Sequence, residues 1–141
     1  MRRTLLVLLG LTLVLVACGG DSSSDDAAPA DAPGLRLVSP DEGEVIRADP
    51  PEGLVVLDVR TPEEFAEGHL EDAVMLDFYE EDFAAQLAEL DPDAPYLLYS
   101  RSGNRSGQTV ELMRELGFTD VADVDGGILA WDEAGRPIVT D

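Results

Sequence analysis

The sequence has a single cysteine, Cys18, and a single histidine, His69. One cysteine cannot form a disulfide bond within the chain, and it cannot supply the ligands of a zinc or iron–sulfur centre built from thiolates. Cys18 lies near the N-terminus. The sequence therefore offers no thiol for chemistry anywhere after residue 18.

Positive charge is also scarce, because the chain has nine arginines, no lysine and 30 acidic residues. Its formal net charge is −21, and it becomes −23 once the first 17 residues, which hold two arginines and no acid, are removed. A strongly negative chain repels polyanions, which argues against nucleic acid or an anionic membrane surface as a partner. Such acidity also suits solubility in a salty or extracytoplasmic setting. A site for a small anion has to be built locally.

Long apolar runs are missing too, and the longest, residues 5–16, is too short to cross a membrane. It follows Arg2 and Arg3 and leads into Ala17-Cys18, a pattern typical of an export signal. The end of this segment resembles the bacterial lipoprotein box, in which cleavage before the cysteine is coupled to lipidation of its sulfur, with palmitate among the acyl chains. We therefore expect a signal peptide at 1–17, a lipidated Cys18, and a protein anchored to a membrane of the cell envelope on its extracytoplasmic side. An ordinary signal peptide and a buried strand are the alternatives.

Residues 18–34 continue as CGGDSSSDDAAPADAPG, with no large apolar residue. Such a segment cannot bury enough surface to fold, so we expect a disordered acidic tether that spans roughly 20–25 Å. Residues 35–141 have the composition and length of one modest domain.

Within residues 35–141, short apolar runs alternate with helical patterns. The expected strands are 35–38, 54–59, 73–76, 96–99 and 121–124. One helix starts at Thr61 with Pro62 and Glu64 forming its cap, and others are expected at 80–90, at 106–116 before Gly117, and from Gly126 through Trp131. This alternation predicts an α/β fold with a mostly parallel sheet.

The stretch between the fourth strand and its helix has the residues of an anion-binding loop. In a parallel sheet, ligands bind beyond the carboxyl ends of the strands. A loop curling there directs backbone N–H groups inward, and the following helix adds its positive end. Gly103 permits the backbone angle required, while Arg101 and Arg105 add charge. Arg105 is able to fork onto a loop carbonyl or an anion. Taken alone, Ser100, Ser102 and Asn104 also suit a simple turn.

Several motifs occur together in one order, and their succession resembles a single rhodanese-type sulfurtransferase domain. They are LDVRTPEEF (57–65), GHL (68–70), SRSGNRS (100–106), LGF (116–118) and GGILAW (126–131). The resemblance covers nearly all of residues 35–141. It implies about five strands flanked by helices, and a loop that begins at a catalytic cysteine and wraps an anion or persulfide.

The resemblance does not hold equally well at every residue. Ser100 occupies the place of the catalytic cysteine, while Arg101, Ser102, Gly103, Asn104, Arg105 and Ser106 match the anion- or substrate-binding loop. Asp58 and Arg60 match a pair whose role is mainly structural. His69 matches a packed, hydrogen-bonded position, with a catalytic base as the lesser alternative, and Trp131 is expected in the core.

A hydroxyl is far less acidic than a thiol, so Ser100 cannot form the persulfide. Three functions remain open. The first is a rhodanese-like pseudoenzyme at the cell envelope that binds thiosulfate, sulfate, phosphate or an envelope protein. The second is sulfur handling with a thiol from a partner, and the third is a hydrolase that uses Ser100 as nucleophile. No metal or cofactor is expected, and the sequence does not identify the ligand.

Overall fold

The computed structural model describes residues 34–140, so the expected signal peptide, Cys18 and nearly all of the tether lie outside the described residues. Five parallel strands form one sheet in the order β1-β5-β4-β2-β3. The strands are β1 (Leu35–Val38), β2 (Val55–Asp58), β3 (Val74–Met75), β4 (Pro95–Tyr99) and β5 (Asp120–Val124). This confirms the predicted α/β fold with its parallel sheet.

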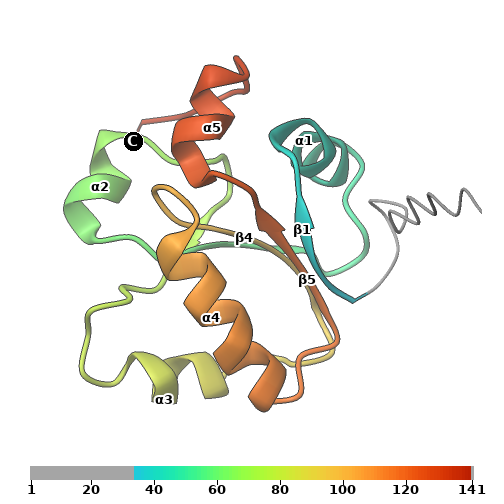
Figure 1. Cartoon of the computed structure of the whole chain (residues 1–141), viewed down its shortest axis with the longest axis vertical. Helices are drawn as coiled ribbons and strands as arrows, with labels where there is room; N and C mark the ends of the chain where they lie inside the picture. The colour runs from blue at the N-terminus through green and yellow to red at the C-terminus, as the bar shows by residue number, and fades with distance from the viewer. Residues whose placement is uncertain (1–33, 141) are drawn as a thin grey trace, which may run out of the picture.

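Within residues 34–140, four helices connect these strands and a fifth follows β5, and together they cover both faces of the sheet (Figure 1). They are α1 (Pro40–Ala48), α2 (Pro62–Glu67), α3 (Phe83–Ala88), α4 (Asn104–Glu115) and α5 (Gly127–Glu133). Side chains from α1 and α5 pack in one apolar cluster, and those from α3 and α4 pack in the other. None of the helices within residues 34–140 has the length and apolarity needed to cross a bilayer.

Helix α1 is the element that the sequence analysis missed. Its start carries a full capping box: Ser39 accepts from the Glu42 amide, and the Glu42 carboxylate accepts from the Ser39 amide. Pro40 occupies the first turn. The signal Ser-Pro-Asp-Glu was present in the sequence, in the same form as the Thr61 capping box, which the structure confirms.

Several helix boundaries also differ from the expected ones, including those of α5, which covers Gly127–Glu133 rather than residues 126–131. Helix α4 begins at Asn104, two residues before the expected start at Ser106, because Gly103 already has the left-handed conformation and ends the loop. Helix α3 covers only Phe83–Ala88 of the expected range 80–90, since the flanking residues form turns. These changes leave the strand order intact.

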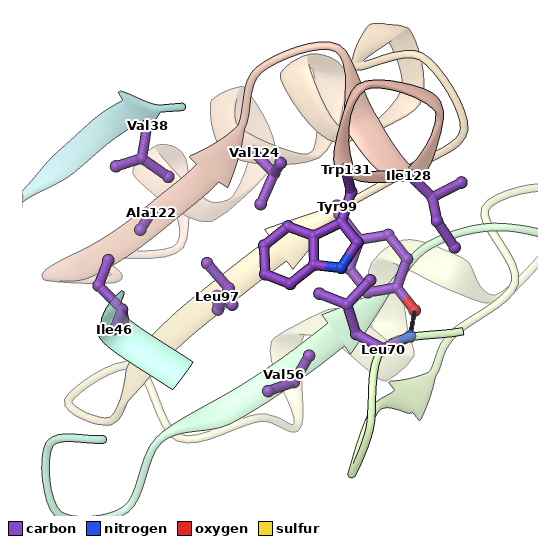
Figure 2. Packing of buried hydrophobic residues seen from close by; sticks show 10 residues of the cluster. All are labelled: Val38, Ile46, Val56, Leu70, Leu97, Tyr99, Ala122, Val124, Ile128 and Trp131. Atoms are coloured by element: carbon purple, nitrogen blue, oxygen red, sulfur yellow. Dashed lines mark hydrogen bonds between the residues drawn. The ribbon is translucent and has the colours of Figure 1, made fainter. Parts of the chain in front are cut away.

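The core on the α1 and α5 face is built around Trp131 and Tyr99, both fully buried (Figure 2). The Trp131 indole N–H donates to the carbonyl of Pro137 at 2.9 Å, and the Tyr99 hydroxyl accepts from the Leu70 amide at 3.1 Å. Trp131 is therefore a core residue, as predicted. Tyr99 is the last residue of β4, so this packing fixes the strand end from which the candidate loop departs.

Candidate functional site

The candidate loop lies where the sequence analysis places it, between the end of β4 and the start of α4. Ser100 follows Tyr99 directly, and Gly103 turns the chain with φ at +93°. A residue with a side chain is strained in that conformation. The loop therefore opens at the carboxyl edge of a parallel sheet, which is the edge where such folds bind ligands.

The start of α5 holds the first part of this loop. The Ile128 amide donates to the Ser100 carbonyl at 2.9 Å, and the Leu129 amide donates to the Arg101 carbonyl at 3.1 Å. The two backbones approach so closely that a Cβ on Gly127 would lie 2.4 Å from the Ser100 carbonyl oxygen. The two glycines of the GGILAW motif therefore allow the N-terminal end of α5 to approach the loop closely and to donate hydrogen bonds to its carbonyls.

The loop also has several backbone N–H groups that are able to bind a ligand. Within residues 34–140, no acceptor is found for the amides of Arg101, Ser102, Asn104, Arg105 and Ser106. Three of these open the 12-residue helix α4, whose N-terminal end carries partial positive charge. A loop that presents free N–H groups at a helix N-terminus is suited to hold an anion.

The Ser100 side chain is fully buried, and its hydroxyl is used inside the loop. It donates to the Ser106 hydroxyl at 3.2 Å and accepts from the Gly103 amide at 3.1 Å. Ser106 in turn donates to the Gly103 carbonyl at 3.3 Å. Among the described residues, no imidazole or carboxylate hydrogen-bonds to the Ser100 hydroxyl, so it lacks the adjacent base that a serine nucleophile requires.

The two loop arginines differ in their surroundings. Arg105 forms a two-pronged ion pair with Glu64 of α2, with both N–O distances at 2.7 Å, and its guanidinium lies 5.5 Å from the Tyr79 ring centre. It therefore forks onto Glu64 rather than onto a loop carbonyl. The Arg101 side chain is exposed and forms no ion pair within residues 34–140. Arg101 is the loop cation available to a ligand without breaking an existing pair.

The sequence did not indicate the ion pair between Glu64 and Arg105. Glu64 was expected only in the capping box of α2, which it does form through the Thr61 amide. Its second partner lies 41 positions away in the chain, and no local pattern reports such a contact. The pair ties the start of α2 to the start of α4 beside the loop.

Asp58 and Arg60 form a buried ion pair below this edge of the sheet. Asp58 is fully buried, and its carboxylate accepts from the Arg60 side chain at 2.7 Å and from the Arg60 amide at 2.8 Å. Arg60 also donates to the Gly68 carbonyl at 2.7 Å. The pair joins the end of β2 to the chain after α2, in keeping with the expected structural role.

His69 also contacts the scaffold. Its Nδ1 lies 2.9 Å from the Phe65 carbonyl oxygen, and its ring stacks on Phe65 with 3.7 Å between centres. Its backbone pairs with Val139 in an isolated antiparallel bridge. These contacts match the packed, hydrogen-bonded position expected for His69.

The ion pair between Glu64 and Arg105 makes stability depend on pH. The Arg105 hydrogen bond lowers the pKa of Glu64 from 4.5 to about 2, although partial desolvation opposes the shift. Because the pKa of Glu64 is lower in the folded state than in the unfolded state, the ionised carboxylate stabilises the fold at pH values above 4.5. This contribution is expected to be lost as the pH falls from 4.5 towards about 2. Glu64→Gln should lower the free energy of unfolding near neutral pH by about 1 kcal/mol or less.

Urea unfolding of both proteins across the acidic range measures this effect. We expect the difference between wild type and Glu64→Gln to shrink as the pH falls through that window. Glu63→Gln, on the same helix but exposed, should show no such change. A Glu64→Gln difference that is constant with pH would contradict the ion pair.

Comparison with known proteins gives one consistent result. Residues 42–134 match the family model described as a rhodanese-like domain. A sulfurtransferase of Allochromatium vinosum is 35% identical over 88 residues, covering 62% of this chain and 80% of that protein. The thiosulfate sulfurtransferase GlpE of Pseudomonas entomophila is 35% identical over 97 residues, covering 69% and 84%. The crystal structure of a rhodanese-related protein from Thermoplasma volcanium has a TM-score of 0.66 at 28% identity, covering 76% of this chain and all of the other.

Proposed function

The chain belongs to the rhodanese-like family, and on that premise we propose that it is a lipid-anchored binding module that holds a small oxyanion and lacks sulfurtransferase activity of its own. The observation that carries the proposal is Ser100. Its buried hydroxyl is bonded within the loop. By the resemblance of the loop motif, Ser100 stands where the family has its catalytic cysteine.

The chemistry of the family explains why this residue matters. In a sulfurtransferase, a thiolate attacks the outer sulfur of thiosulfate, sulfite leaves, and the enzyme keeps a persulfide. The Ser100 hydroxyl is not ionised at neutral pH, and the sequence has no cysteine after residue 18. The chain therefore lacks the group that would accept the sulfur.

The loop remains suited to the anion itself. Its unpaired amides, the N-terminus of α4 and the exposed Arg101 all favour negative charge. Relatives named as thiosulfate sulfurtransferases support an anion of the same class, namely thiosulfate or sulfate. Affinity is expected to be modest, because residues 35–141 hold seven arginines and 26 acidic residues, a net charge of −19 that repels anions.

A titration with sulfate or thiosulfate, followed by NMR, tests this proposal. We expect the amide signals of residues 100–106 to shift at millimolar concentrations of the anion. Arg101→Gln should weaken the binding, whereas Arg114→Gln should not, because Arg114 is already paired with Glu111 on the exposed face of α4. No shift of these amides at tens of millimolar anion would count against an anion-binding loop.

Sulfur handling with a thiol from a partner is the second candidate, and the names of the relatives favour it. In that case the loop would hold thiosulfate without a covalent bond while the partner's thiolate attacks it. Adding a small thiol such as glutathione to protein and thiosulfate should then release sulfite faster than the thiol alone does. The hydrolase candidate has weaker support, because no base within the described part of the chain hydrogen-bonds to the Ser100 hydroxyl.

The anchor is proposed from Cys18 and the segment before it. The mature chain is expected to begin at Cys18 with a lipidated sulfur, and mass spectrometry of membrane-fraction protein checks this. Cys18→Ala should leave an uncleaved precursor or a soluble protein, because each buried CH₂ of an acyl chain contributes about 0.8 kcal/mol to membrane binding. A mature N-terminus elsewhere, or an unmodified Cys18, would exclude the anchor.

A further inference from the structure

The capping box of α2 does not explain why residue 64 carries a negative charge. Glu64 accepts from the Thr61 amide through Oε2 at 3.2 Å, which completes that box. Glutamine completes a capping box as glutamate does, so the cap needs the side-chain oxygen but not its charge. The shortest hydrogen bonds of the carboxylate, both 2.7 Å, come instead from Arg105 at the start of α4. The charge of Glu64 is therefore directed at Arg105.

The side chain of Arg105 is held firmly on α2. Its Nη1 and Nη2 atoms donate to different oxygens of Glu64, the bidentate arrangement in which a guanidinium and a carboxylate bind each other most strongly. The ring of Tyr79 lies against the same guanidinium, with 5.5 Å between its centre and the Arg105 Cζ atom. The side chains of Arg105 and Glu64 are only 12% and 22% exposed, so salt and water screen the pair weakly.

The backbone of Arg105, by contrast, belongs to the anion-binding loop. Its amide is one of the N–H groups at the start of α4 for which residues 34–140 provide no acceptor. The fork of a guanidinium fits two oxygens of a carboxylate and two oxygens of a tetrahedral oxyanion alike. A carboxylate on α2 and an anion in the loop are therefore rival partners for Arg105, and Glu64 already occupies it.

We propose that Glu64 is an internal competitor of the oxyanion: its carboxylate keeps Arg105 on α2 and so holds the anion affinity of the loop low. This inference rests on the proposed function, because it concerns the anion that the loop binds. While the pair is intact, its two charges nearly cancel, and Arg101 is the loop cation that attracts the anion. Without the carboxylate, Arg105 becomes available to the anion as a second cation.

Sulfate titrations of the full chain in detergent micelles, followed through the amide signals of residues 100–106, test the competition. Glu64→Gln removes the charge but keeps a side chain able to cap α2, so the variant should fold. It should bind sulfate about fivefold more tightly than the wild type, because an amide oxygen holds a guanidinium less strongly than a carboxylate does. Glu63→Gln removes the same charge from an exposed position of α2 and should change the affinity less than about twofold.

A double variant, Glu64→Gln with Arg105→Gln, separates competition for Arg105 from a general loss of negative charge. It keeps the net charge of the wild type and should bind sulfate within about twofold of it, since the second cation is gone. The side-chain Nε–H signal of Arg105 gives a direct readout in the other forms. Sulfate should shift this signal clearly in Glu64→Gln and only weakly in the wild type.

The possible outcomes distinguish the competition from the proposed function. Equal sulfate affinity of Glu64→Gln and Glu63→Gln overturns the competition and leaves the proposed function standing. A double variant that binds as tightly as Glu64→Gln also overturns the competition, because Arg105 then plays no part in the gain. Binding by Glu64→Gln alone supports the competition but counts against anion binding by the wild type. No binding by any form at tens of millimolar sulfate overturns both.

Discussion

Asp58→Ala is expected to lower the free energy of unfolding by about 3–5 kcal/mol, a large share of the 5–15 kcal/mol typical of a folded domain. The carboxylate of Asp58 is fully buried and accepts three hydrogen bonds at 2.7–3.0 Å from the Arg60 side chain. Without it, Arg60 keeps a buried charge, and within residues 34–140 the Gly68 carbonyl is the one hydrogen-bond acceptor left to its side chain. An uncompensated charge in a low-dielectric interior is the cause of the loss.

The same substitution at an exposed ion pair is the matched control. Asp41 pairs with Arg136, yet the Asp41 side chain is 69% exposed, so Asp41→Ala should cost less than about 1 kcal/mol. The double variant Asp58→Ala with Arg60→Ala should lose less than the sum of the two single losses, because it leaves no unpaired charge. Urea denaturation measures all four. A loss below about 1 kcal/mol for Asp58→Ala would mean that the buried pair does not support the end of β2.

Ser100→Cys is expected to confer sulfur chemistry on a loop that has no thiol of its own. The substitution replaces one oxygen with sulfur at the side chain that accepts a hydrogen bond from the Gly103 amide. That amide and the N-terminus of α4 should lower the pKa of the new thiol from about 8.5 and so provide thiolate. The thiolate can then attack the outer sulfur of thiosulfate, releasing sulfite and leaving a persulfide on residue 100.

Intact-mass spectrometry after incubation with thiosulfate detects this adduct as the gain of one sulfur atom, and peptide mapping locates it. Ser102→Cys is the matched control, since it introduces the same thiol at an exposed position of the same loop. The wild type, whose only thiol is Cys18, reports any background. If Ser100→Cys folds normally but takes up no sulfur, the loop is too closed to admit thiosulfate, because Ser100 is fully buried. The anion-binding proposal would then lose its main support.

The fold could be predicted from the sequence largely because its signals are local. Apolar runs such as residues 96–99 indicate buried strands, and Thr61 with Pro62 and Glu64 marks a helix start through contacts three residues apart. The order of the motifs then fixed the family, which residues 42–134 confirm. Helix α1 was missed even though its capping box is of the same kind.

The candidate site was less predictable because its contacts join distant parts of the chain. The residues of the loop were identified, but not the partner of Arg105, which lies on α2. The sequence did not indicate that Asp123 is buried, because no local pattern in the strand segment VADV distinguishes a buried carboxyl group from an exposed one. The burial of Asp123 results from tertiary packing, which the local sequence does not report.

The central claim is that the chain keeps the rhodanese-like loop but lacks its cysteine nucleophile. The most direct test is to measure whether the wild-type protein releases thiocyanate from thiosulfate and cyanide. The wild type should release no more thiocyanate than the reaction without protein, while Ser100→Cys, assayed beside it, should exceed that background. Turnover by the wild type that survives Cys18→Ala would contradict the account, because sulfur would then be transferred by a chain with no thiol.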